Sequence, residues 1–269
     1  MTVLTPRRAA SSRAGARARA WLPPVLLLAA LLGVWQGAVA IRNVPPYVLP
    51  SPARIAGAFV TARSLLPRDL ATTTVEAVLG LVVGAGVGAL LAGLVAAVPP
   101  VRRALYPLLV VSQTIPMIVL APLLVLWFGY GITPKVVVVA LIVFFPVVVS
   151  TVAALAGVDP ELIDLVRSMG ADRMTVLRMV LVPAAIPAFF AGLRISAAYA
   201  VAGAVVGEWV GAQSGLGIFI DRSKASFRID RVFVAVVMVA VLSMALFAAV
   251  GAIGRMAAPW QHAAERGRS

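Results

Sequence analysis

Long apolar segments, separated by short polar ones, recur along the whole chain. Each is close to the 20 residues that an α-helix needs to cross the hydrocarbon core of a membrane. They cover approximately residues 21–40, 73–98, 105–128, 136–155, 184–210 and 232–253. Hydrophobic residues make up 62% of the 269 positions and charged residues only 12%, which no soluble domain of this size requires. The sequence therefore predicts an all-α, polytopic membrane protein with about six transmembrane helices.

The formal net charge of +13 is carried mostly by arginines at the ends of the apolar segments. This distribution is typical of cytoplasmic loops and argues against nucleic-acid binding. We expect a disordered, basic, cytoplasmic N-terminus over residues 1–20, a transmembrane domain over 21–258 and a cytoplasmic tail over 259–269. Both termini then lie inside, and residues 129–134 and 211–231 form outer loops.

The first apolar segment has a second interpretation. Its last residues, Ala38-Val39-Ala40, resemble the cleavage site of a secretory signal peptide, although the segment is long for one. Cleavage would leave the orientation of the later segments unchanged.

Residues that usually carry catalysis are scarce. The chain has no cysteine, and its one histidine, His262, lies in the polar tail. A phosphate-binding Walker A loop places lysine directly after glycine, whereas Lys135 follows Pro134 and Lys224 follows Ser223. We therefore expect no catalytic, cofactor or metal site, and any ATP to be bound by a separate subunit.

The second apolar segment begins with Thr73 and Glu76, whose spacing is that of a helix-capping box. We prefer this explanation of Glu76 to a role in proton transport. Small residues then recur at every fourth position, which allows helix backbones to approach closely in lipid. These residues are Gly80, Gly84, Gly88, Ala92 and Ala96.

The polar stretch 159–183 carries the signals of two short helices. Asp159 is a suitable N-cap and Gly170 a suitable C′ residue; Asp172 caps a second helix, which Pro183 ends. An apolar stripe on the first helix comprises Leu162, Leu165, Val166 and Met169. Such a stripe outside the bilayer needs a surface to cover it.

One candidate surface is the membrane itself. Helices that lie flat on a membrane are usually rich in Lys and Arg on their polar face. Here Asp159, Glu161 and Asp164 oppose Arg167, which favours docking on another protein.

This stretch resembles a motif of ABC-importer permeases. Asp164-Leu165-Val166-x-x-x-Gly170, followed by Val180-x-Val182-Pro183, is similar to their E-A-A-x-x-x-G…I-x-L-P loop. The glycine and the proline keep their spacing, while Asp replaces Glu and larger apolar residues replace the two alanines. Residues 112–137 and 203–217 resemble the nitrate, taurine and alkanesulfonate permeases, in particular the branch linked to thiamine-pyrimidine precursors and riboflavin.

The resemblance implies a type I ABC importer permease fold with a cytoplasmic coupling helix in the loop 158–183. The residues that would contact the ATPase are Asp164, Leu165, Val166, Arg167, Ser168, Met169, Gly170, Ala171 and Pro183. The implied partners are an ABC ATPase subunit, a second permease subunit forming a homodimer, a solute-binding protein and lipid of a bacterial inner membrane. The cargo would be a precursor of the thiamine pyrimidine, a riboflavin-like compound, or a sulfonate, taurine or nitrate.

Polar and aromatic residues within the apolar segments are candidates for the translocation pathway. They are Gln113, Thr114, Tyr199, Glu208 and Trp209. The alternative is an ion-coupled secondary transporter, with Glu76, Lys135, Arg194 and Glu208 as its relay. Such transporters often contain an internal repeat, and none is visible in this sequence. The alternative also leaves the polar stretch 159–183 unexplained.

Overall fold

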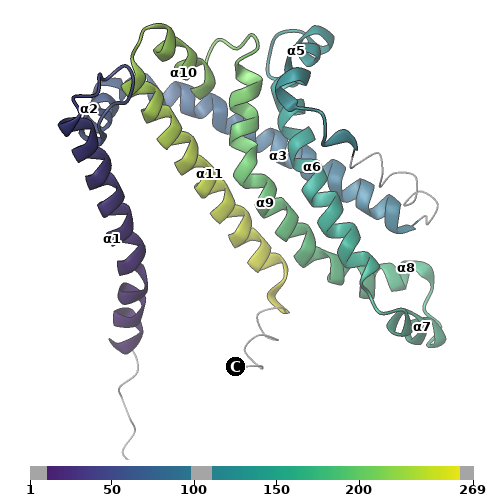
Figure 1. Cartoon of the computed structure of the whole chain (residues 1–269). Coiled ribbons are helices and arrows are strands. Elements are labelled where there is room, and N and C mark those ends of the chain that lie inside the picture. Colours follow the sequence, from purple (N-terminus) through teal and green to yellow (C-terminus); the bar gives the residue numbers. More distant parts are fainter. Residues whose placement is uncertain (1–10, 98–110, 261–269) are drawn as a thin grey trace, which may run out of the picture.

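The computed structural model describes residues 11–97 and 111–260, and every regular element in these ranges is helical (Figure 1). In chain order the elements are α1 (Ser11–Ile41), α2 (Pro52–Ala62), α3 (Leu66–Ala97), α5 (Met117–Phe128), α6 (Thr133–Ala156), α7 (Pro160–Ser168), α8 (Arg173–Val176), the π-helical η1 (Leu177–Leu181), α9 (Val182–Glu208), α10 (Leu216–Ala225) and α11 (Ile229–Ala257). The all-α prediction is confirmed.

Five helical runs in the described ranges are long and apolar enough to cross a membrane. They lie in α1, α3, α6, α11 and the continuous run of α8, η1 and α9. The sixth predicted span is described only from residue 111, and α5, with 12 residues, is too short to cross by itself. Residues 98–110, which include Arg102 and Arg103 between the second and third predicted spans, lie outside the described residues.

Helix α1 lies apart from the other long helices and approaches the chain near α2 (Figure 1). It begins at Ser11, within the stretch for which we expected disorder, because alanine and arginine both favour helix. Residues 1–10 lie outside the described residues. The apolar side chains from Leu22 to Val34 are largely exposed, so this helix contributes little to the core.

The core lies where α6 packs between α3 and α9. Gly80, Gly84 and Gly88 of α3 face Val139, Val143 and Val147 of α6. An added Cβ at Gly84 would lie 2.7 Å from the Cβ of Val143 and 2.8 Å from the carbonyl oxygen of Ala140. The predicted close approach of backbones is therefore a contact within the chain.

Pro183 does not end a helix, contrary to our prediction. Proline lacks an N–H, and its ring collides with the carbonyl group four residues earlier in a regular α-helix. The backbone accommodates this by one π-helical turn, η1, and continues into α9. The resulting run from Arg173 to Glu208 has 36 residues, about 54 Å. It exceeds a hydrocarbon core of about 30 Å, so one end projects from the membrane.

We expect Gly84→Ala to lower the free energy of unfolding by about 1–3 kcal/mol, because the methyl group overpacks the contact with α6. Gly86→Ala is the matched control, since nothing lies within 4 Å of its added Cβ, and it should be neutral or slightly stabilising. Thermal unfolding of the purified chain in detergent, followed by circular dichroism, measures the difference. Equal melting temperatures would contradict the packing described here.

Candidate functional site

Two groups of residues, at opposite ends of the α8–η1–α9 run, are candidate functional sites. The first is the α7–α8 hairpin, residues 159–176, which projects at one end of the long helices (Figure 1). Asp159 caps α7 by accepting the backbone N–H of Glu161 at 2.9 Å. Pro160 occupies the start of the helix, where its missing N–H costs nothing.

Gly170 ends α7 in the left-handed conformation, with a φ of +87°. Its N–H donates to the carbonyl of Arg167 at 2.9 Å, and the N–H of Ala171 donates to that of Val166 at 3.3 Å. These two bonds form a Schellman motif, which satisfies carbonyls that the helix end leaves free. The predicted C′ role of Gly170 is confirmed.

Asp172 caps α8, and the N–H of Thr175 donates to its carboxylate at 2.8 Å. The hydroxyl and the backbone N–H of Thr175 lower the pKa of this carboxylate. A lowered pKa gives a stabilisation that is present above the unfolded-state pKa and is lost only as the pH falls through the folded-state value. The cap therefore stays formed at neutral pH.

The apolar stripe of α7 is only partly covered by the chain itself, and α7 contains no buried side chain. Leu162, Val166 and Met169 line a groove of about 700 Å³, which the end of α6 and residues of η1 complete. Leu165 does not line this groove and is 59% exposed, while Met169 is 80% exposed. Asp164 and Arg167 form an exposed ion pair at 3.6 Å.

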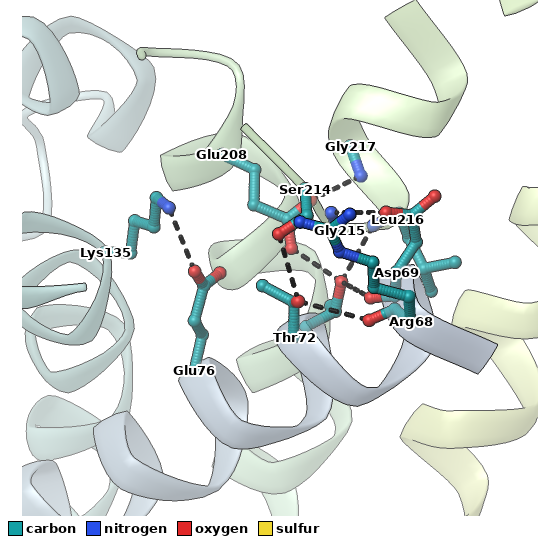
Figure 2. Close-up of polar contacts among 11 residues, drawn as sticks. Arg68, Asp69, Thr72, Glu76, Lys135, Glu208, Ser214, Gly215, Leu216 and Gly217 are labelled. Atoms are coloured by element: carbon teal, nitrogen blue, oxygen red, sulfur yellow. Dashed lines mark hydrogen bonds and ion pairs between the residues drawn. The ribbon is translucent and has the colours of Figure 1, made fainter. Parts of the chain in front are cut away.

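The second group, the Glu208 network, surrounds Glu208 at the far end of α9 (Figure 2). Its carboxylate is fully buried and accepts the hydroxyl of Thr73 and the backbone N–H of Gly217, each at 2.5 Å. Thr73 in turn accepts the N–H of Leu216 at 2.8 Å. These bonds hold the N-terminus of α10 against α3 and α9.

The loop before α10 is fastened to α3 at two further points. The N–H of Gly215 donates to Asp69 at 3.0 Å, and the hydroxyls of Thr72 and Ser214 lie 3.2 Å apart. Gly215 has a φ of +127°, and a side chain there would collide with the carboxylate of Glu208. Gly217 is confined by the same carboxylate. Glycine is thus required on both sides of Leu216.

Glu76 and Lys135 form a buried ion pair of 3.0 Å beside this network (Figure 2). Our assignment of Thr73 and Glu76 to a capping box is therefore wrong. Helix α3 begins at Leu66, so both residues lie in its interior. Glu76 pairs with Lys135 of α6, and Thr73 bonds Glu208 of α9. The spacing of residues along α3 reveals neither partner.

The candidate pathway residues are dispersed. Gln113 and Thr114 are exposed just before α5, and the Thr114 hydroxyl donates to the carbonyl of Val111 at 2.8 Å. Tyr199 is 58% exposed and Trp209 46% exposed, whereas Glu208 is enclosed in its network. The described structure thus brings three members of the alternative ion relay together, Glu76, Lys135 and Glu208, but Arg194 lies elsewhere, over the ring of Phe247.

Residues 84–258 match the model of the family described as binding-protein-dependent transport system inner membrane component. The chain belongs to this family. A riboflavin transport system permease protein, RibX, of Chloroflexus aurantiacus is 38% identical over 89% of this chain and 90% of its own length. A formylaminopyrimidine transport permease protein, ThiX, of Halalkalibacterium halodurans is also 38% identical, over 89% of this chain and 96% of its own.

A solved structure titled as an inward-facing MetNI methionine ABC transporter contains a chain of similar fold. The TM-score is 0.55 and the identity 25%, over 72% of this permease and 94% of that chain. The resemblance to ABC-importer permeases and the predicted fold class are thus confirmed. As a family member the chain is a multi-pass inner membrane component of a binding-protein-dependent transporter, rather than an ATPase.

We expect Thr73→Val to destabilise this permease by about 1–3 kcal/mol, because it removes the acceptor of the Leu216 N–H and one of the two donors to the Glu208 carboxylate. Thr74→Val is the matched control, since its hydroxyl bonds only the carbonyl of Leu70 in the same helix. The midpoint of thermal unfolding in detergent reports the difference. Equal effects of the two substitutions would show that the network contributes nothing.

Proposed function

We propose that this permease forms the membrane pathway of an ATP-driven importer for a small ring compound of the riboflavin or formylaminopyrimidine type. The identity of 38% to two such permeases supports this cargo. A sulfonate, taurine or nitrate is the alternative cargo, as the sequence motifs allow. A separate binding protein delivers the cargo to the outer face.

The observation that carries the proposal is the α7–α8 hairpin. It is well ordered by its caps, projects beyond the long helices and presents apolar side chains that the chain leaves exposed. Under the proposal, an ABC ATPase subunit covers these side chains. The contact residues are Asp164, Leu165, Val166, Arg167, Ser168, Met169, Gly170 and Ala171, while Pro183 shapes the helix behind them.

The α8–η1–α9 run supplies the mechanical connection. Closure of the ATPase dimer displaces the hairpin, and the continuous helix transmits this displacement toward Glu208 and Trp209 at its other end. Because Glu208 holds the N-terminus of α10, the same movement rearranges the outer surface. Gln113, Thr114 and Tyr199 are exposed to a pathway between two subunits.

The proposed arrangement is a homodimer in a bacterial inner membrane. Residues 21–258 form the transmembrane domain, 158–183 the coupling loop, and 1–20 and 259–269 cytoplasmic extensions. The hairpin and both termini lie on the cytoplasmic side. Helix α1 is retained as a membrane anchor, and its exposed apolar side chains contact lipid.

Reconstitution tests the proposal directly. The permease, its ATPase and its binding protein are co-purified and placed in proteoliposomes, and uptake of labelled riboflavin is measured with ATP and with its non-hydrolysable analogue. We expect uptake only with hydrolysable ATP, and competition by formylaminopyrimidine but not by taurine. Uptake that requires an ion gradient and no ATP would favour the secondary transporter.

Gly170→Val should reduce substrate-stimulated ATP hydrolysis about tenfold, because a left-handed conformation costs roughly 1–2 kcal/mol with a side chain. Nothing in this chain lies within 4 Å of the added Cβ, so within the permease the effect comes from backbone conformation. Gly157→Ala is the control: its φ is −87° and its added Cβ makes only ordinary contacts. Full stimulation in the Gly170→Val complex would argue against coupling through the hairpin.

A further inference from the structure

A cavity of about 330 Å³ lies between α9 and α11 and contains two arginines, Arg194 and Arg255. Both side chains are exposed to it. Within the described residues, neither guanidinium has a carboxylate within 4.0 Å. The cavity therefore concentrates positive charge without a counter-ion in the described part of the chain.

Both arginines line this cavity because α9 and α11 pack against each other there. The N-terminus of α9 and the C-terminus of α11 lie at the same end as the hairpin (Figure 1). Arg255 lies in the last turn of α11, and the guanidinium of Arg194 lies beside Gly251, one turn before it, and over the ring of Phe247.

The cavity is shaped by glycine and aromatic residues. The guanidinium carbon of Arg194 lies 4.1 Å from the centroid of the Phe247 ring, a stacking contact that fixes its plane. An added Cβ at Gly251 would lie 3.2 Å from the Nε of Arg194, and one at Gly254 would lie 3.0 Å from the Cβ of Phe190. Side chains at either glycine would occupy the space that the arginines face.

The depth of Arg194 restricts what binds there. It precedes Glu208 by 14 positions, about 21 Å along the helix. With Glu208 taken as the outer boundary of a hydrocarbon core of about 30 Å, and on the orientation proposed above, Arg194 lies roughly 9 Å inside the inner boundary. An unpaired charge at this depth is costly, whereas an arginine that reaches toward the headgroups and meets an anion is not.

We propose that Arg194 and Arg255 bind a phosphate group, held by the planar guanidinium of each residue. The depth favours the phosphate of an anionic phospholipid of the inner leaflet, and basic cavities between helices on this side suit such headgroups. A soluble phosphate entering from the cytoplasm has the same chemistry. The two sources are separated by experiment.

Native mass spectrometry of the purified full-length permease, titrated with phosphatidylglycerol, tests the proposal. We expect wild type to bind phosphatidylglycerol in preference to phosphatidylcholine. Arg194→Ala and Arg255→Ala should each weaken binding about fivefold, and Arg178→Ala, which removes an exposed charge outside the cavity, should not. Competition by millimolar inorganic phosphate would assign the site to a soluble phosphate; its absence would assign it to lipid.

Gly251→Val supplies an independent test, because it fills the cavity and keeps both charges. It should lose phosphatidylglycerol binding to the same extent as the arginine variants. Wild type without preference for phosphatidylglycerol or affinity for phosphate would overturn the proposal. So would arginine variants that bind lipid normally but lose the dimer in size-exclusion chromatography, since the arginines would then contact the second subunit. None of these readouts depends on transport.

Discussion

A charged side chain among membrane-spanning helices must find its partner inside the protein, because the surrounding lipid offers none. In the described residues, three buried charged residues meet this constraint together where α3, α6 and α9 meet, while a fourth, Asp230, pairs with Arg228 at the start of α11. Lys135 pairs with Glu76 at 3.0 Å, and Glu208 receives a hydroxyl and a backbone N–H. The groups are contributed by three helices and by the start of α10, so these interactions fix how the elements are arranged. Removing one partner would leave a buried charge uncompensated, which is far more costly than the pair itself is stabilising.

This network and the α7–α8 hairpin are the two ends of a single helical run. Pro183 would ordinarily break such a run, but the π-turn of η1 preserves its continuity. The run is continuous from the hairpin to Glu208 although it contains the π-turn and Pro187, and the proposed coupling requires this continuity. Gly192 and Ser196 bring α9 into close contact with the backbone of α6, so the run is packed tightly against its neighbour.

Sequence reasoning succeeded where the signal was local. Asp159, Gly170 and Asp172 act within one turn of their own positions, and each was predicted correctly. The recurring glycines of α3 also have a periodic signal. The prediction of a capping box at Thr73 and Glu76 was wrong although the spacing fitted. Glu76 pairs with Lys135, 59 positions away, and Thr73 bonds Glu208, 135 positions away. The prediction at Pro183 was wrong because a π-turn can accommodate a proline without ending the helical run.

The α7–α8 hairpin is held together mainly by local interactions. Helix α7 has nine residues and no buried side chain, and a helix this short is marginal in water by itself. Its order must come from the caps at both ends and from the groove along Val166. A hairpin preformed in this way loses little conformational entropy when another protein covers it. Capping therefore takes the place of packing here, and it leaves the apolar side chains of α7 available for a partner.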